Sequence, residues 1–365
     1  MEIKSFAGLR NTSPIRSIPD NALSAAFDVD LDDVGILTQR PGYTQSLATP
    51  ITTAYTTLDW TTYIVSGGYL YLVHDDLSLQ RLALSTATAF SDFGKVLFTN
   101  DGLRVEGGVA VNIKMPTPDT PPAMSIIKGS MPVGTYSAVF CYVSAAGLEG
   151  GSSPAASIYL ASPGMPVATA PTPPAGYTTE IYMTACDGTV YYGPEGEQIN
   201  PMGLVANPFP EKVDTLAWHE GKLFVSHALP DGSTVIWFSS AFHPHIYNTE
   251  QDYVIIPGTV LDMASTAQGL IIGTDAAIYL YGDSLEVLAT YGVIKGRPFA
   301  RTPEGTVYMH TEWGTCMGMP FQNLTYNKCS LAPGIQCSTA LRYHDGIEQF
   351  VVLTDGSGKP FNARS

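Results

Sequence analysis

Three aspartates alternate with apolar residues in FDVDLDDVGILTQRPGY, the stretch that spans Phe27–Tyr43. On an extended strand, alternate side chains share one face, so these carboxylates would lie side by side. Carboxylate oxygens are ligands that Ca²⁺ prefers. The candidate calcium ligands are Asp28, Asp30 and Asp32.

The spacing of this stretch excludes the most specific calcium motif. An EF-hand loop places Gly at its sixth position and Glu at its twelfth, and here these positions hold Asp33 and Gln39. A looser calcium site stays open. The alternative is a solvent-exposed strand face on which Arg40 pairs with one aspartate, a contact that contributes little when exposed.

A second candidate metal site is the pair His243 and His245, which flank Pro244. In an extended segment, two histidines two positions apart face the same side and could bind one metal ion. No third ligand lies nearby in the sequence. The expected role is therefore packing or hydrogen bonding beside Trp237 and Tyr247, and we expect no cofactor.

Hydrolytic chemistry has little support in the sequence. A glycosidase needs two carboxylates placed across the scissile bond. The segments Ser91–Phe98 and Thr354–Phe361 come close to the S-x-D-x-G turns repeated in sialidase propellers, but each lacks one residue of that spacing. A G-x-S-x-G nucleophile elbow and a G-x-x-x-x-G-K-[ST] phosphate loop are absent. We expect that the protein is not an enzyme, with a propeller glycosidase as the least favoured alternative.

The chain of 365 residues carries 33 acidic and 18 basic residues, a formal net charge of −15. Nucleic-acid binding needs lysine and arginine to neutralise phosphates, so this balance disfavours it. Only 14% of the residues are charged and 45% are hydrophobic, which is enough to bury a core. The abundance of glycine, proline and tyrosine favours strands and turns over helices.

The cysteines number five and include no C-x-x-C pair, which argues against a disulfide framework. We expect small buried thiols in a protein made in a reducing cytoplasm. No segment resembles a secretory signal, and no apolar run reaches the roughly 18 residues of a membrane span. The cysteines are Cys141, Cys186, Cys316, Cys329 and Cys337.

The elements that would position these residues are short hairpins. Alternating strands joined by a glycine-containing turn recur along the chain, in later parts at intervals of about 40 to 50 residues. Four-stranded blades stacked around an axis repeat at that interval, because one blade cannot bury both of its faces. The expected hairpins span Thr61–Asp76, Val213–His227, Met263–Asp283, Glu304–Gly318 and Ala340–Asp355.

The middle of the chain follows a different plan. A proline-rich segment, Met115–Ala123, precedes several short alternating strands within about 90 residues, which is typical of a small β-sandwich. We therefore expect an all-β fold, a β-propeller of about six blades with an inserted Ig/fibronectin-like β-sandwich. Residues 1–116 and 207–365 would form the two parts of the propeller, and residues 117–206 the inserted sandwich.

The N-terminal run FAGLRNTSPIRSIPDNALSAAFDVDLDDVGILTQRPGY resembles the opening of tailed-bacteriophage virion proteins of the β-propeller tail hub or nozzle type. The runs GTYSAVFCYVSAAGLEGGSSPA and GYTTEIYMTACDGTVYY are similar to the fibronectin-type module that such proteins carry. The later runs VDTLAWHEGKLFVSH, IWFSSAFHPHIYN and GLIIGTDAAIYLYGD are similar to their propeller half. The matching N-terminal positions are Gly8, Leu9, Asn11, Pro19, Ala26, Asp28, Val29, Asp30, Gly35, Leu37, Arg40, Pro41 and Gly42.

The resemblance implies a structural virion protein without catalytic activity, assembled as a homo-oligomeric ring in the phage tail. On this hypothesis the ring is part of the DNA-ejection conduit, where genomic DNA passes an acidic lumen without binding because like charges repel. The implied partners are other copies of the chain and the adaptor, portal, tube or fibre proteins of the tail. The protein would be made in the host cytoplasm and end in the virion tail.

Arginine is enriched at protein interfaces, so the expected subunit-interface residues are Arg40, Arg297 and Arg301. An alternative from another functional class is a receptor- or glycan-binding module at the tail tip. That alternative predicts a pocket lined by tyrosine or tryptophan at one face of the propeller.

Overall fold

The computed structural model describes an all-β chain. The described residues are 9–10, 22–23, 29–31, 37–39, 46–199, 208–326, 328, 332–344 and 347–355. None of these segments forms a helix of the length and apolarity that crossing a membrane requires. Near the N-terminus, β1 (Val29–Leu31) pairs with β2 (Leu37–Gln39) in an antiparallel ladder.

Two four-stranded antiparallel sheets follow, each with its strands paired in chain order. Their turns carry the residues that tight hairpins need, such as Gly67 and Gly68 with φ of 55° and 80° between β4 and β5. The first sheet contains β3 (Thr53–Thr56), β4 (Thr62–Ser66), β5 (Tyr69–Val73) and β6 (Leu79–Leu84). The second sheet contains β7 (Phe90–Phe93), β8 (Val96–Thr99), β9 (Leu103–Glu106) and β10 (Val109–Asn112).

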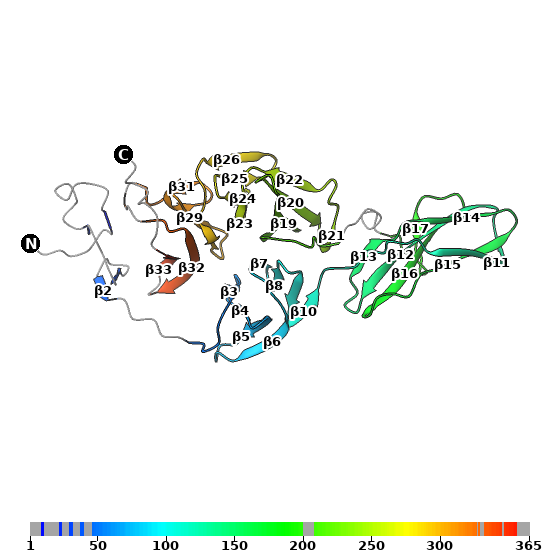
Figure 1. Cartoon of the computed structure of the whole chain (residues 1–365), viewed down its shortest axis with the longest axis horizontal. Helices are drawn as coiled ribbons and strands as arrows, with labels where there is room; N and C mark the ends of the chain where they lie inside the picture. Colours follow the sequence, from blue (N-terminus) through cyan, green and yellow to red (C-terminus); the bar gives the residue numbers. More distant parts are fainter. Residues whose placement is uncertain are drawn as a thin grey trace, which may run out of the picture.

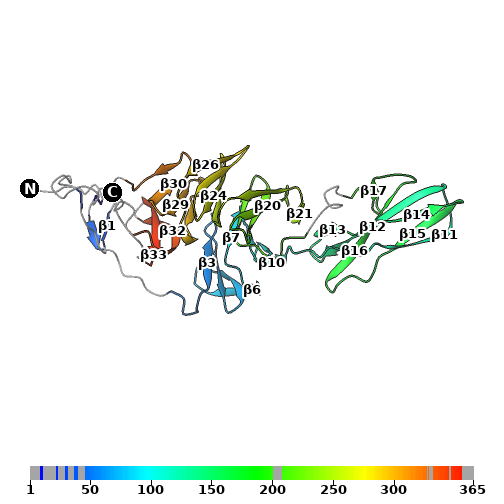
Figure 2. The same cartoon turned by 45° about the horizontal axis from the view of Figure 1, so that its top comes forward.

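The chain then leaves these sheets and forms a separate pair of sheets, drawn in green in Figures 1 and 2. A two-stranded ladder joins β11 (Ala123–Met131) and β15 (Gly164–Thr169). A five-stranded sheet has β12 (Gly134–Ser144) at its centre. Its other strands are β13 (Glu149–Ser152), β14 (Ala156–Leu160), β16 (Tyr177–Thr184) and β17 (Tyr191–Tyr192).

Four more sheets complete the chain. The third has five strands, β18 (Leu216–His219), β19 (Lys222–Ala228), β20 (Thr234–Ser240), β21 (His243–Tyr247) and β22 (Tyr253–Ile256). The fourth contains β23 (Val260–Thr266), β24 (Gly269–Thr274), β25 (Ile278–Tyr281) and β26 (Leu285–Ala289). The fifth contains β28 (Phe299–Arg301), β29 (Val307–Thr311), β30 (Gly314–Met317) and β31 (Gln322–Asn323). The sixth contains β27 (Lys295–Arg297), which is parallel to β32 (Gln336–His344), and β33 (Ile347–Thr354).

These six sheets follow one another around a ring, as Figure 1 shows. The first strands of neighbouring sheets contact one another, β7 with β18, β18 with β23, and β23 with β28. Strand β32 in turn contacts β28. The sheets are therefore arranged as propeller-like blades, with their first strands innermost.

Buried apolar side chains fill the space between successive sheets from the first to the fifth. Leu70 of the first sheet shares a core with Leu97 of the second, and both are fully buried. Trp218 of the third sheet and Phe98 of the second sheet belong to another buried core cluster. The same arrangement joins the third sheet to the fourth and the fourth to the fifth, through the core pairs Ile236 with Met263 and Ile271 with Met309. Each sheet thus buries a face only by contacting its neighbour.

The sixth sheet returns to the first. The indole of Trp60, in the turn between β3 and β4, meets the ring of Tyr343 on β32 edge to face, with centroids 5.5 Å apart. Arg297 of β27 donates a hydrogen bond to the carbonyl of Ala54 on β3, and its guanidinium lies 5.1 Å from the centroid of the Tyr55 ring. These contacts join the last part of the ring to its beginning.

The all-β prediction is confirmed, and so are the predicted hairpins. The expected pairs appear as β4–β5, β18–β19, β23–β24, β29–β30 and β32–β33, each with an antiparallel register.

The aromatic contact between the first and sixth sheets predicts a measurable coupling. Trp60→Ala and Tyr343→Ala should each destabilise the chain, and the double mutant should lose less than the sum, with a coupling of about 0.5–1.5 kcal/mol. Urea unfolding of the four proteins measures this coupling. The control cycle pairs Trp60→Ala with Tyr159→Ala on β14, for which additive effects are expected. Additive effects in the Trp60–Tyr343 cycle would contradict the closing contact.

Candidate functional site

A cavity of about 460 Å³ lies where the inserted sheets meet the second and third sheets of the ring. Its wall on the insert side is residues 147–150, the end of the turn after β12 and the start of β13. A cavity of this size falls within the range of about 300–1,000 Å³ that holds small organic ligands. Its aromatic lining residues are Phe93, Phe98, Trp218 and Phe242, and its ionisable ones are Arg104, Glu149, His243 and His245.

A stack of three aromatic rings forms one wall of the cavity. The Trp218 ring stacks with Phe98, at a centroid distance of 5.1 Å and 2° between ring planes, and with Phe93, at 5.3 Å and 27°. The Trp218 backbone N–H donates to Ser91 Oγ at 2.8 Å, which fixes β18 against β7. Phe93 is 54% exposed, whereas Trp218 is 8% exposed. The Phe93 ring is therefore accessible, and the Trp218 ring is buried.

Phe242 presents a fourth aromatic ring from the turn between β20 and β21. It is 71% exposed and has a φ of 60°, a conformation that is uncommon for a bulky residue and costs roughly 1–3 kcal/mol. Its N–H donates to the Gly221 carbonyl at 2.6 Å, and its ring covers Gly221, where an added Cβ would lie 3.0 Å from Cζ. The turn therefore holds an exposed aromatic side chain in a strained but well-connected position.

His245 joins the ring to the insert. Its Nε2 lies 2.9 Å from the Glu149 carbonyl oxygen. Burial lowers the pKa of His245 to about 4. Its Nδ1 is buried and lacks a hydrogen-bond partner among the described residues, a state that costs about 1–3 kcal/mol.

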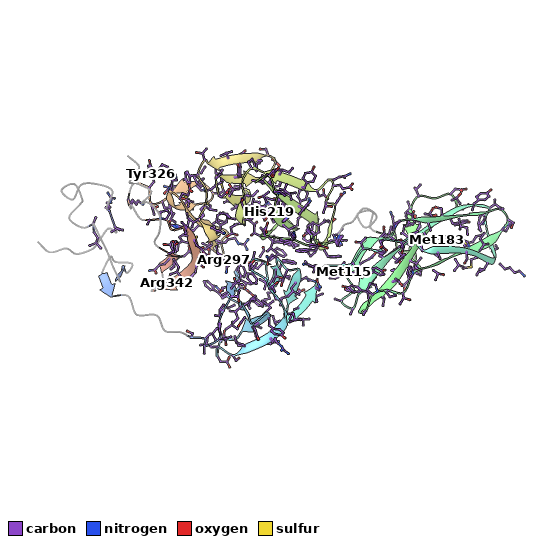
Figure 3. All side chains as sticks on the ribbon, in the orientation of Figure 1. Met115, Met183, His219, Arg297, Tyr326 and Arg342 are labelled. Carbon is purple, nitrogen blue, oxygen red and sulfur yellow. The ribbon has the colours of Figure 1, made fainter. Side chains whose placement is uncertain are left out.

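Polar contacts link the inner strands of the ring. The Tyr55 hydroxyl on β3 donates to Asp92 on β7, and His219 Nδ1 on β18 lies 2.9 Å from Ser265 Oγ on β23. Figure 3 labels His219 and Arg297 within the ring. Arg301 on β28 reaches Asp92 at 3.6 Å, which joins the fifth sheet to the second across the ring. The Asp92 residue is only 2% exposed, so its charge is balanced by partners from other sheets.

The structure places the predicted interface residues as follows. Arg301 pairs with Asp92, and Arg297 contacts Ala54 and the Tyr55 ring, so both bind other sheets of the same chain. Arg40 lies outside the described residues. Their use between subunits, and the expected homo-oligomeric ring, stay predictions.

The described structure does not test the predicted calcium ligands, which stay a prediction. Asp28 and Asp32 lie outside the described residues, and for Asp30 only the backbone, in β1, is described. Within the described ranges, no group of three or more His, Cys, Asp or Glu side chains could hold a metal ion. His243 and His245 have ring centroids 6.1 Å apart, and each bonds a backbone carbonyl instead.

The buried thiols are not poised for nucleophilic chemistry. Cys141, Cys316 and Cys337 are buried and free, and burial raises the pKa of each, for Cys337 to about 12. A protonated thiol is a poor nucleophile. Cys186 is half-buried and free, and Cys329 lies outside the described residues.

Sequence reasoning missed the aromatic side chains of the cavity. Phe93 lies in the segment Ser91–Phe98, which drew attention only as an incomplete sialidase turn, and Trp218 was assigned to a hairpin. Phe242 directly precedes the histidine pair. The available signal was an aromatic residue at or beside a hairpin turn, where a side chain projects from the end of a sheet.

No protein-family model matches this chain, and no curated protein matches it. Among solved structures, the chain is similar to the extracellular domain of a B. thetaiotaomicron protein described as a hybrid two-component system. The two share 11% sequence identity, and the TM-score is 0.33. The match covers 93% of this chain and 42% of that domain's chain. A second such domain from the same organism gives 10% identity, 78% and 33% coverage, and a TM-score of 0.30. PorZ, a surface component of the type-IX secretion system of Porphyromonas gingivalis, gives 11% identity, 82% and 45% coverage, and a TM-score of 0.22.

The chain therefore spans less than half the length of these three structures, at 42%, 33% and 45%. At these TM-scores the likeness assigns no function to this chain.

The resemblance to phage tail proteins is corrected by this comparison, because the structures above are bacterial sensor and secretion-system domains. The structural virion function, the DNA-ejection conduit and the tail location depended on that resemblance and are wrong with it. One physical fact explains the error. Hairpins with glycine turns are required by any ring of sheets, so their order indicates a fold and not a function.

Asp262 on β23 predicts a pH-dependent stability. Burial raises the pKa of this carboxyl to about 6, against a favourable charge on Arg297. Because the folded pKa lies above the unfolded value of about 4, the stabilising effect of the protonated form is complete below about pH 4. It is lost as the pH rises to about 6.

The test compares Asp262→Asn with the parent protein by urea unfolding from pH 4 to 7. The parent should lose roughly 2 kcal/mol relative to the variant over that range, because Asn keeps the bond from the Met263 N–H at 2.9 Å but cannot ionise. Asp283→Asn, at an exposed position, should show no such trend. Parallel pH profiles for the parent and Asp262→Asn would refute the assignment.

Proposed function

We propose that the protein is a non-enzymatic module that binds a short neutral glycan in the cavity between the ring and the insert. The six sheets would form a closed six-bladed β-propeller, and residues 117–206 an inserted Ig/fibronectin-like sandwich that supplies one wall of the site. Residues 1–116 and 207–365 would contribute the two parts of the propeller.

The aromatic lining of the cavity carries this proposal. A pyranose ring has a face of C–H groups and an edge of hydroxyls, so it stacks on a flat aromatic surface while its edge makes hydrogen bonds. Phe93, which is 54% exposed and rests on the buried Trp218, provides such a surface, and Phe242, at 71% exposure, adds a second ring to the lining. Pockets of this kind combine apolar walls with few polar groups that orient the ligand.

The acidic content of the cavity supports binding without hydrolysis. Glycoside hydrolysis uses two carboxylates that flank the scissile bond. Among the described residues that line the cavity, Glu149 is the one acid. Among the described lining residues, a second carboxylate, which either hydrolytic mechanism needs, is therefore absent.

The charge of the chain favours a neutral ligand. A formal net charge of −15 repels polyanions at long range, which disfavours nucleic acids and strongly acidic polysaccharides. The arginine that lines the cavity, Arg104, already pairs with Glu106. A neutral oligosaccharide meets neither obstacle.

Binding of the full chain to a glycan array, followed by isothermal titration of the hits, tests the proposal. Phe242→Ala and Phe93→Ala should each weaken binding at least about tenfold, because each removes an accessible stacking surface. Tyr159→Ala is the matched control, since Tyr159 is an exposed aromatic residue, at 61%, outside the cavity. An array without hits would refute the proposal, and so would hits that are equally weakened by Tyr159→Ala.

A further inference from the structure

We infer that His245 selects ligands that carry a hydrogen-bond donor beside a flat apolar face, by accepting that hydrogen bond at Nδ1. This inference rests on the proposed function and deepens it, because it assigns a ligand chemistry to one wall of the same cavity. Its support is the geometry of the imidazole and of the aromatic stack that shares the cavity with it.

The hydrogen bond to the insert fixes the tautomer of His245. A carbonyl oxygen can only accept, so the 2.9 Å contact with the Glu149 carbonyl requires a proton on Nε2. A neutral imidazole carries one N–H. Nδ1 therefore presents a lone pair and acts only as an acceptor.

The surroundings of His245 keep the ring neutral. Burial is the main cause of its lowered pKa, and the charges of His243 and Arg104 act in the same direction, while the bond to Glu149 opposes them. The pKa of about 4 lies well below neutral pH. The lone pair on Nδ1 is consequently present under physiological conditions.

The Nδ1 lone pair accepts no hydrogen bond from the described residues. His245 is 6% exposed, lines the cavity, and has no hydrogen-bond partner at Nδ1 among the described residues. Buried polar atoms are paired in the great majority of cases, so an unpaired one in a residue that lines a cavity points to a partner from outside the chain.

The partner must be a donor. A hydroxyl or an amide N–H satisfies Nδ1, whereas a carboxylate or a phosphodiester at neutral pH offers only further lone pairs. The exposed ring of Phe93, backed by Trp218, favours a flat apolar face on the same ligand. The two requirements together describe the hydroxyl-bearing edge and the C–H face of a sugar, and also a simple phenol.

Two small probes isolate the contribution of the donor, whatever the natural ligand is. 4-Fluorophenol and 4-fluoroanisole share a flat fluorinated ring, but only the phenol donates a hydrogen bond. Their dissociation constants for the full chain are measured by ¹⁹F NMR at pH 7. We expect the phenol to bind roughly three- to tenfold more tightly than the ether. Equal affinities would overturn the inference.

Two substitutions separate ligand recognition from the link to the insert. In His245→Gln the side-chain amide can still donate to the Glu149 carbonyl but offers no acceptor at the Nδ1 position, so the preference for the phenol should disappear. In His245→Asn the amide oxygen can occupy the Nδ1 position, so part of the preference should be kept. A preference kept by His245→Gln and lost by His245→Asn would contradict the assignment.

A measurement on the unmodified chain covers the case in which a variant fails to fold. The ¹⁵N chemical shift of a lone-pair imidazole nitrogen moves upfield when it accepts a hydrogen bond. In histidine-labelled protein, 4-fluorophenol should shift the Nδ1 signal of His245 and 4-fluoroanisole should not. No shift with the phenol would refute the inference.

The outcomes distinguish this inference from the proposed function. Glycan binding that depends on Phe242 and Phe93, together with equal affinities for the two probes, would refute the role of His245 and keep the function. A phenol preference that depends on His245, together with an empty glycan array, would keep the chemistry of the site and refute the glycan as its ligand.

Discussion

A single four-stranded sheet exposes two apolar faces, and covering both is the constraint on which this structure depends. Leu70 and Leu97 come from different sheets, as do Ile236 and Met263, yet each pair lies in one buried cluster. No sheet of the ring forms a core by itself, so the sheets must follow one another until the last meets the first. The contacts of Trp60 with Tyr343 and of Arg297 with Ala54 make that final connection.

The same constraint concentrates polar chemistry at the centre of the ring. Innermost strands converge, so side chains from distant parts of the sequence meet there. Asp92 receives hydrogen bonds from the Tyr55 hydroxyl and, at 3.2 Å, from the Leu58 N–H, and it faces Arg301 from across the ring. A buried carboxylate is tolerated because several partners surround it. The network therefore joins inner strands of the first, second and fifth sheets at the centre of the ring.

Away from the centre, hairpin ends carry the exposed aromatic side chains Phe93 and Phe242. The insert shares a cavity with them. Its turn at residues 147–150 approaches the stack of Trp218 with Phe93, and the bond from His245 to Glu149 fixes that approach. The cavity remains because the ring and the insert do not pack closely here. Its walls are mainly apolar, and His245 Nδ1 is left without a hydrogen-bond partner among the described residues. Ligand pockets often have such a lining of apolar groups with few polar atoms.

Local rules allowed much of the fold to be predicted. Alternation in TTYIVSGGYLYLV sets two strands, and Gly67 with Gly68 sets the turn between them, because side-chain period and positive φ are properties of neighbouring residues. The resemblance that used such patterns was wrong about function, because hairpin patterns indicate the fold and carry no information about function.

What the sequence alone determined is thus the all-β class and the hairpins. Only the tertiary structure decided that His245 meets Glu149, 96 residues away, or that Arg301 reaches Asp92 across the ring. The pattern that predicts a strand lies within a few neighbouring residues. A cavity between sheets instead depends on residues that are far apart in the sequence. Their relative placement depends on which apolar faces cover one another, and that information is spread over the whole chain.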